Sequence, residues 1–539
     1  MIFKKKILFL LFFINTSQAQ PELRFNPFDW ISYRQSGSIN SISFGDRYAF
    51  LGTQNGGVIR FNVRTQRFEE PITKSQGLKS NFVTAVHYSS SGMLWVATIN
   101  GLHYSFNAEG DWRYISLESL GLSVRNPITK IGDDNKDIWI EAFGQYKRLD
   151  GVTGVVLETM VRQNRMISWS SGLNTLWQNP SNQLFDFTFL DGWMQNLNEM
   201  IDPYGKSTKI TTIAENKYGE IVVGCENGFF FFGDNTMKLM SPFRFGLTSD
   251  DVTTLAGKHS FWLGGRNSMP SDGITFFDYN RNLFEHYTFE NILNIDAFRI
   301  FSSYEYKKNL YLGGDDKIVH LDIKNLVWSQ YYLPSSVRTN IVLNMDYFED
   351  NLWLGTTNGL KLFDLKSKKF IENKITDLLN NSLIFDLLVL NNFIFIGSDL
   401  GLFIYDKNNN NLYEQESFGY TDSEFEFSSF QFNYTALASF RNEVFFANEE
   451  SVIKLNLTSR KWSKVLGSEI FGGITINALA VNRSYLFLAT DNALLQYHLK
   501  DKLVEVFNYE FLGNINTLEI DRSNLLIGTS EGIVSFLYK

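Results

Sequence analysis

The chain has 539 residues, a formal net charge of -9 and an aromatic content of 16%. This apolar content is too high for a disordered chain, and no basic cluster stands out along the sequence, which argues for a solvated acidic surface and against a nucleic-acid partner. Cys225 is the single cysteine, so an intramolecular disulfide and a thiolate metal site are excluded.

The first 19 residues have the pattern of a secretory signal peptide. Lysines at 4–6 precede an apolar run at 7–14, and Ser17, Gln18 and Ala19 form a cleavage site with small residues at its first and last positions. The apolar run is too short to span a bilayer. We therefore expect cleavage before Gln20 and an exported protein that works in the periplasm or outside the cell.

A short pattern then recurs to the end of the chain: an apolar, often aromatic strand that ends in Gly or Ala, a turn, and a second apolar strand. Clear copies lie at 48–62, 94–104, 221–232, 352–364, 393–406 and 525–536. Weaker copies centre on Trp139, Trp262, Leu312, Phe446 and Leu488, and a degenerate one lies near Trp177 and 184–189. The spacing of about 42 residues and the strand-rich content are typical of β-propeller blades.

Each repeat predicts four strands, and two details support this interpretation. Asn-Gly pairs at 55–56, 100–101, 227–228 and 358–359 fall between the second and third strands, where tight hairpin turns need positive φ. The small residue in the second strand, such as Gly52 or Gly355, is expected where neighbouring sheets crowd around a central channel.

The last repeat ends after its third strand, so its sheet needs a strand from elsewhere. Residues 29–33 look like a fourth strand without the other three, and we expect such an early strand to close a ring. Twelve blades exceed the usual size of one propeller. The preferred fold is thus all-β, with about twelve four-stranded blades in two rings of about six, at 20–290 and 291–539. The alternative is seven blades plus five or six. In the preferred division, 29–33 closes the first ring and 283–287 closes the second.

The repeats resemble the two-component regulator propeller repeat, in which an apolar run with Trp is followed by Gly-Thr, a turn and Gly-Leu-x-x-Phe/Tyr-Asp. Residues 352–364 match this form closely, and 393–406 are similar. The resemblance covers nearly all of 25–539. It implies tandem propellers of the kind found in periplasmic sensors of hybrid histidine kinases. The layout is also similar to the double-propeller component of the type IX secretion system, without its sorting domain.

No cluster of residues in the sequence predicts catalysis, a metal or a cofactor. The six histidines are scattered, and although His103, His320 and His498 share third strands, we expect them to replace ordinary strand residues. The runs 133–137 and 406–411 are better explained as turns than as calcium loops. Asp422, Glu424 and Glu426 alternate in one stretch, as a glycosidase pair could, but exposed carboxylates are more common.

The sequence therefore favours a non-catalytic binding or scaffold protein with a protein or glycan partner. Long loops at 266–272 and 418–432 would form its site, with Phe418, Tyr420, Phe425 and Phe427 as candidate partner-binding residues. Two other hypotheses stay open at this stage, namely a component of a secretion or envelope assembly and a propeller enzyme such as a lyase or glycosidase.

Overall fold

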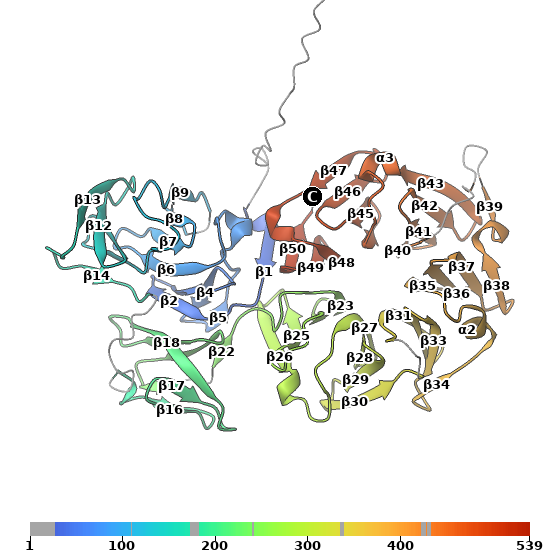
Figure 1. Cartoon of the computed structure of the whole chain (residues 1–539), viewed down its shortest axis with the longest axis horizontal. Helices are drawn as coiled ribbons and strands as arrows, with labels where there is room; N and C mark the ends of the chain where they lie inside the picture. Colours follow the sequence, from blue (N-terminus) through green and yellow to red (C-terminus); the bar gives the residue numbers. More distant parts are fainter. Residues whose placement is uncertain are drawn as a thin grey trace, which may run out of the picture.

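The computed structural model describes residues 27–538 except 109, 173–182, 240–241, 335–338, 422–426 and 428–432. This part of the chain forms antiparallel sheets, mostly of four strands, arranged as propeller blades (Figure 1). The predicted all-β propeller is confirmed. The predicted signal peptide lies outside the described residues. None of the described helices is long and apolar enough to cross a membrane.

Seven of the sheets form a ring, seen on the right of Figure 1. From the innermost strand outward, they are β23 (Thr254–Gly257), β24 (Phe261–Gly264), β25 (Gly273–Asp278) and β26 (Leu283–Thr288); β27 (Ile300–Tyr306), β28 (Asn309–Gly314), β29 (Lys317–Asp322) and β30 (Val327–Tyr332); β31 (Val342–Phe348), β32 (Asn351–Thr356), β33 (Gly359–Asp364) and β34 (Lys369–Ile371); β35 (Ile384–Leu390), β36 (Phe393–Ser398), β37 (Gly401–Asp406) and β38 (Asn411–Glu414); β40 (Ala436–Phe440), β41 (Glu443–Ala447), β42 (Ser451–Asn456) and β43 (Lys461–Gly467), with β39 (Tyr420–Thr421) beside β43; β44 (Ala478–Val481), β45 (Tyr485–Ala489), β46 (Leu494–His498) and β47 (Val504–Phe507); and β48 (Ile515–Asp521), β49 (Asn524–Thr529), β50 (Gly532–Leu537) and β1 (Trp30–Tyr33).

The other four sheets form a smaller unit, seen on the left of Figure 1. They are β2 (Ile39–Phe44), β3 (Tyr48–Thr53), β4 (Val58–Asn62) and β5 (Arg67–Phe68); β6 (Val83–Tyr88), β7 (Leu94–Thr98), β8 (Gly101–Ser105) and β9 (Arg113–Ser116); β10 (Lys130–Asp133), β11 (Ile138–Ala142), β12 (Gln145–Leu149) and β13 (Val156–Met160), with β14 (Ser168–Trp169) beside β10; and β18 (Ser207–Glu215), β19 (Ile221–Cys225), β20 (Phe229–Gly233) and β21 (Lys238–Leu239), with β15 (Thr188–Phe189), β16 (Met194–Asn196), β17 (Glu199–Ile201) and β22 (Phe243–Arg244) at its edges.

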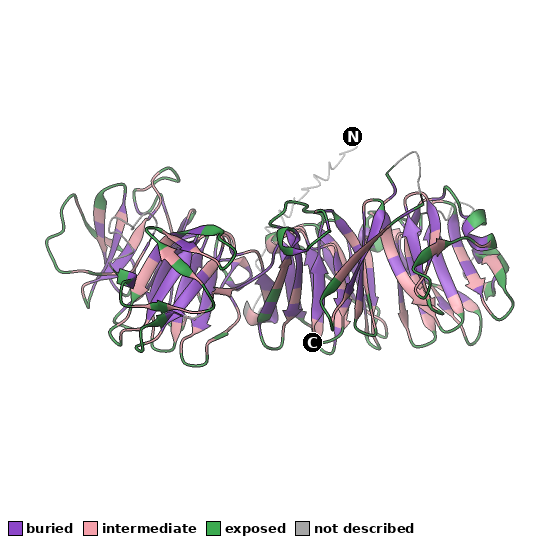
Figure 2. Ribbon diagram, turned by 90° about the horizontal axis from the view of Figure 1, so that it is seen from below, coloured by how far each residue is buried: buried purple, intermediate pink, exposed green. Residues whose placement is uncertain are grey.

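Short helices lie between the sheets. They are the α-helices α2 (Lys374–Leu378) and α3 (Ser468–Phe471), and the 3-10 helices η1 (Pro27–Asp29), η2 (Lys74–Gln76), η3 (Phe289–Asn291), η4 (Gln415–Ser417) and η5 (Glu510–Leu512). Figure 2 shows the ring edge-on, with the strands crossing its thickness and much of their length coloured as buried.

An early strand closes a ring, as the sequence predicts. Strand β1 pairs antiparallel with β50, with Trp30 opposite Phe536 and Tyr33 opposite Ile533. It therefore supplies the missing fourth strand of the last sheet.

The predicted division into six and six blades is wrong. Strand β23 contacts both β27 and β48, so the sheet at 254–288 belongs to the seven-sheet ring, and the predicted boundary near 290 falls inside that ring. Strand β1 closes this ring and not the first one, and β26 at 283–288 is the outer strand of its own sheet. The alternative division, seven blades plus five or six, contains a ring of seven blades, as the structure does. Part of the degenerate fourth repeat lies at 173–182, outside the described residues.

The four-sheet unit is inserted between β1 and the rest of the ring, and two adjacent linkers join them. Gln35 forms an antiparallel bridge with Gly246, and the Ser36 hydroxyl donates to the carbonyl of Phe245 at 2.6 Å. One hydrophobic cluster runs from Phe61 in the small unit through Phe245 to Phe284 in the ring. The two units therefore share a continuous core.

The small residue of the second strand is required by the neighbouring sheet, as expected. A Cβ atom built on Gly52 would lie 2.6 Å from side-chain atoms of Val83 and Val86 on β6. A Cβ on Gly355 would lie 2.8 Å from Ile384 on β35. A larger residue would push the sheets apart at these points. The predicted Asn-Gly turn is also seen at Gly359, where φ is +91°.

Polar side chains at the starts of the inner strands bind the next sheet all around the ring. Most donate to the first carbonyl groups of the following inner strand; the pairs are Thr253 and Ile300, Ser302 and Val342, Thr435 and Ile476, Asn477 and Ile515, and Asn516 and Val252. At the two other junctions Asp386 accepts hydrogen bonds from Asn344 and from the amide of Leu437. Each of these bonds joins the beginning of one inner strand to the beginning of the next. All the inner strands therefore run in the same direction.

We expect Asn516→Ala to lower the free energy of unfolding by about 1–2 kcal/mol, because the buried carbonyl of Val252 loses its side-chain donor. Chemical denaturation followed by far-UV circular dichroism checks this. Asn482→Ala is a matched control, because Asn482 ends an inner strand and binds within its own turn and to Tyr538. Equal losses in both variants would contradict the prediction.

Candidate functional site

The parallel inner strands give the ring two chemically different faces. In every sheet of the ring the hairpin between the first and second strands emerges on one face, and in the six sheets other than the one closed by β1 the hairpin between the third and fourth strands emerges there too. The remaining hairpins and the links between sheets emerge on the opposite face. The two sets of turns can therefore be compared as surfaces.

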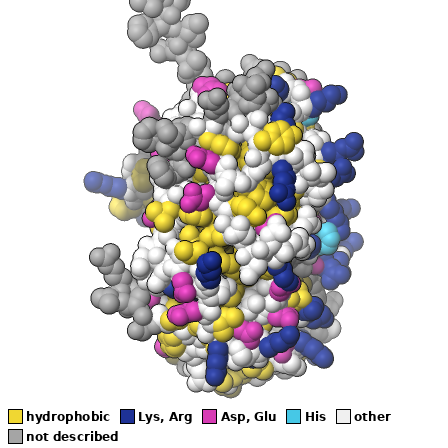
Figure 3. Space-filling model, turned by 90° about the vertical axis from the view of Figure 1, so that its right-hand side faces the viewer, with side chains coloured by type: hydrophobic (Ala, Val, Ile, Leu, Met, Phe, Trp, Pro, Cys, Tyr) yellow, Lys and Arg dark blue, Asp and Glu magenta, His cyan; other side chains and the backbone are white. Residues whose placement is uncertain are grey.

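The turns of the first set of hairpins form the surface called the basic face here, and they contain fourteen cations and three carboxylates, while Asp278, Asp322, Asp364, Asp406, Glu443 and Asp521 lie at the strand ends beside these turns. The cations are Lys258, Arg281, Lys307, Lys308, Lys324, Lys366, Lys368, Lys407, Arg441, Arg460, Arg483, Lys500, Lys502 and Arg522; the carboxylates are Glu349, Asp350 and Asp501. Ion pairs involve Arg281, Lys366 and Lys407, and elsewhere on this face the described basic side chains have no carboxylate partner. Figure 3 views the rim of the ring and shows Lys and Arg side chains gathered along one edge.

The opposite face, called the acidic face here, has the reverse composition. Its described loops contain seventeen carboxylates, namely Asp250, Asp251, Asp272, Glu290, Asp296, Asp315, Asp316, Glu372, Asp377, Asp399, Glu416, Glu449, Glu450, Glu469, Asp491, Glu510 and Glu531. The described cations there are Arg34, Arg266, Arg299 and Lys374, and the first three are paired with acids of this face, Arg34 with Asp250 and Glu531, Arg266 with Asp251 and Arg299 with Asp315. The ring is therefore polarised across its thickness.

A central channel of about 650 Å³ is lined by residues from all seven inner strands. Its walls carry buried acids whose surroundings oppose ionisation. Burial raises the pKa of Asp386 to about 7 and that of Asp346 to about 6. Glu519 lines the channel, and desolvation by the surrounding protein raises its pKa to about 7. Near neutral pH these acids are partly protonated, so the channel is less negative than its composition indicates.

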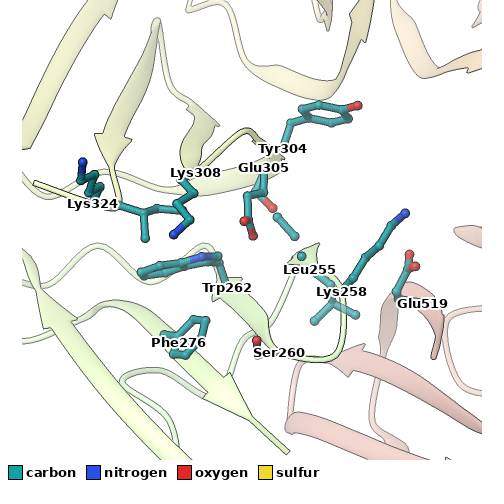
Figure 4. Close-up of a pocket in the computed structure, with 14 residues that line it drawn as sticks. Leu255, Lys258, Ser260, Trp262, Phe276, Tyr304, Glu305, Lys308, Lys324 and Glu519 are labelled. Carbon is teal, nitrogen blue, oxygen red and sulfur yellow. The ribbon is translucent and has the colours of Figure 1, made fainter. Parts of the chain in front are cut away.

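A pocket of about 690 Å³ lies between the sheets of β23 and β27 and shares Leu255, Tyr304 and Glu519 with the channel (Figure 4). Trp262 and Phe276 form its apolar wall, with ring centroids 4.9 Å apart.

Lys308 and Lys324 border this pocket from the basic face, and Lys258 extends beside Glu519 (Figure 4). Burial raises the pKa of Glu305, the second acid of the pocket. The arrangement of three ammonium groups around an apolar wall suits an anionic ligand.

The three predicted partner-binding residues that the structure describes differ in exposure. Phe418 is 2% exposed and packs in the core beside Phe393 and Tyr413. Tyr420 is 55% exposed, and Phe427 is half-buried against Trp462. Phe425 lies outside the described residues, as do Asp422, Glu424 and Glu426. Only Tyr420 of the four is thus open to a partner in the described structure.

The histidines of the third strands stay apart. His103 is buried and accepts a hydrogen bond from the amide of Lys79, and burial lowers its pKa to about 4. His320 contacts Asn309, and His498 contacts Asp501. In the run 133–137, Asp134 accepts backbone amides of its own turn. Across the described ranges no three His, Cys, Asp or Glu side chains are grouped as metal ligands.

The sequence-based expectation that no basic cluster exists is wrong for the ring. The cations lie one or two to a repeat, so they look dispersed along the chain, and the propeller gathers them on one face. The signal in the sequence was the recurrence of Lys or Arg in the turn before the next strand, as at Lys307, Lys324 and Lys366.

Comparisons with known proteins find similarity of fold. No family model matches the sequence, and no curated protein matches it. Among solved structures, the extracellular domain of a putative hybrid two component system from B. thetaiotaomicron is 16% identical, with a TM-score of 0.43 over 93% of this chain and 76% of that chain. The extracellular domain of a putative one component system from the same organism is 14% identical, with a TM-score of 0.42 and the same coverage.

Virginiamycin B lyase from Staphylococcus aureus is 10% identical, with a TM-score of 0.43 over 54% of this chain and 96% of that chain. Similarity at this level transfers no activity or ligand, and the propeller assignment depends on the sheet order of the chain itself. In fold, the chain is similar to these two extracellular domains and to this lyase.

Proposed function

We propose that the seven-sheet ring is a non-catalytic binding module that recognises an acidic glycan through its basic face. The separation of charge between the two faces carries this proposal. The whole chain has a net charge of -9, so cations gathered on one face stand out against its overall charge. The basic face attracts a polyanion, while the acidic face repels it, so the ligand binds in one orientation.

The composition of the basic face favours a glycan over a protein partner. The cores of protein interfaces are depleted in lysine and enriched in aromatic residues. Here lysine and arginine recur in the inner and the outer hairpin turns of the basic face, at intervals set by the blades. A linear polyanion can contact several of these turns at once, and the pocket of Lys258, Lys308 and Lys324 gives it one deeper contact.

The test compares two variants with the same change in charge. Lys258→Glu/Lys308→Glu/Lys324→Glu removes the cations of the pocket. Arg125→Glu/Arg162→Glu/Lys238→Glu changes three exposed cations of the four-sheet unit. Binding of polygalacturonate and of uncharged dextran is measured by biolayer interferometry at two salt concentrations.

We expect the wild type to bind polygalacturonate but not dextran, and to bind more weakly as salt rises. The pocket variant should bind at least about tenfold more weakly, and the control variant within about twofold of the wild type. Equal losses in both variants, or equal binding of dextran, would refute the basic-face site. Stronger binding of duplex DNA than of polygalacturonate would assign the face to a nucleic acid instead.

A further inference from the structure

A second cavity, of about 1120 Å³, lies in the four-sheet unit where the inner strands β2, β6 and β10 meet. It is separate from the channel of the ring. Four side chains that line it form one hydrogen-bonded chain, namely Ser43, His87, Asp133 and Ser170.

The serine, the histidine and the aspartate are in contact in the order that nucleophilic catalysis requires. Ser170 Oγ lies 2.7 Å from Nδ1 of His87, and Nε2 of His87 lies 2.9 Å from Oδ2 of Asp133. The imidazole and the carboxylate are buried, whereas Ser170 is half-buried and borders the cavity. A nucleophile next to a base that is oriented by a third group is the pattern of activated serines.

The hydrogen bonds of Asp133 fix the tautomer of His87. Burial would raise the pKa of Asp133, but hydrogen bonds from His87 and from the amides of Ser90 and Asn135 outweigh it and lower the pKa below its usual range. An ionised carboxylate can only accept, so a neutral His87 donates its one N–H from Nε2. Nδ1 then presents its lone pair to Ser170.

Ser170 is held by three separate strands. Its amide donates to the carbonyl of Ile131 on β10 at 3.1 Å. The next residue, Ser171, exchanges hydrogen bonds with the backbone of Ile42 on β2, and Gly172 forms a bridge with Ala85 on β6. Ser43 Oγ lies 2.9 Å from Ser170 Oγ, so the single hydroxyl proton of Ser170 can be donated either to Nδ1 of His87 or to Ser43. A side chain in a segment that is hydrogen-bonded to three strands meets the geometric need of a catalytic site.

We propose that this cavity is an acyl-ester hydrolase site, with Ser170 as the nucleophile and His87 as the general base. Asp133 is a positioning residue that acts through His87. Ser170 Oγ attacks the ester carbonyl carbon while its proton moves to Nδ1 of His87. The C–O bond to the alcohol then breaks, and the alcohol leaves with that proton. Water attacks the acyl-serine, His87 takes the proton of the water and returns it to Ser170, and the carboxylic acid is released.

The lining of the cavity limits the class of substrate. Besides the four residues of the hydrogen-bonded chain, the walls carry Lys130, Glu215, Tyr88 and Tyr218, with few aliphatic side chains. Such walls suit a short acyl group on a polar alcohol, as in an O-acylated sugar, and not a long-chain lipid ester.

The first experiment uses the wild-type protein alone. It is incubated with a biotinylated fluorophosphonate, and the modified peptide is identified by mass spectrometry. We expect one added phosphonyl group, on Ser170. No labelling, or labelling at another serine, would overturn the proposal.

The second experiment measures hydrolysis of p-nitrophenyl acetate. Ser170→Ala and His87→Gln should each lose at least about 100-fold in rate, while Ser119→Ala, which changes an exposed serine of the same unit outside the cavity lining, keeps the rate within about threefold. Asp133→Asn should lose both hydrolysis and labelling of Ser170, which a purely structural role would not cause in a variant with an unchanged circular dichroism spectrum. If Ser170→Ala fails to fold, the isosteric Ser170→Cys must still lose fluorophosphonate labelling. If hydrolysis is unchanged in these variants, the proposal is refuted and the hydrogen bonds among Ser43, His87, Asp133 and Ser170 have only a structural role.

Discussion

Replacing Trp30 with alanine is expected to lower the free energy of unfolding of the seven-sheet ring by about 3–5 kcal/mol. Trp30 lies on β1, is 2% exposed and stacks on Phe536 with ring centroids 3.8 Å apart. Edge contacts to Phe507, Tyr509 and Phe511 surround it. Its removal leaves a cavity at the strand that closes the ring, so the loss combines packing with weakened closure.

Guanidinium denaturation followed by far-UV circular dichroism measures this loss. Ile31→Ala is the matched control, because Ile31 lies on the same strand but is only half-buried, and it should cost less. If Trp30→Ala stays within about 1 kcal/mol of the wild type, the closure by β1 contributes little to stability.

The second large effect is a loss of stability as pH rises, caused by Asp386. Its pKa is raised to about 7 in the folded protein, from an ordinary value of 3.8, first because the carboxyl is buried and further because Asp346 is near. At pH 4 and below, the carboxyl is protonated in the folded protein. As pH rises towards 7, the unfolded chain releases this proton more readily, so unfolding becomes easier by up to roughly 4 kcal/mol.

The variant Asp386→Asn should flatten this dependence. It keeps one acceptor for the amide of Leu437 but cannot ionise. Between pH 4.5 and pH 8 we expect the wild type to lose more stability than the variant, when both are measured by urea denaturation at several pH values. Parallel pH profiles would show that Asp386 does not titrate as its surroundings indicate.

Much of the fold could be predicted because each repeat carries the same short pattern of strand, turn and small residues. Gly52 and Gly355 mark the places where sheets crowd, and the last repeat shows that one strand is missing. The partition into rings could not be predicted in the same way, because every junction between sheets uses similar residues. Arg34 is one of the few that differ, and its ion pairs with Asp250 and Glu531 depend on contacts across the whole chain.

The sites were harder to predict for a physical reason. His87 lies in β6, Asp133 lies in β10 and Ser170 directly follows β14, and none of the three belongs to a short motif. Their meeting depends on β14 adding to the inner edge of β10, which follows from no local pattern. The basic face likewise arises from turns that are close only after the ring closes. Phe418 is buried in the core, which its sequence position did not reveal, because an aromatic residue in a long loop can pack in the core or contact a partner.

The pairing of β1 with β50 also constrains how the protein can be made. Ribosomal synthesis produces β1 before any other described strand and β50 after all the rest, so the seam of the ring must be the last to form. Until then the edge of β50 and the ring of Trp30 are both uncovered. A synthetic peptide with the sequence of residues 27–34, added during refolding, should therefore occupy that edge and trap an unsealed protein.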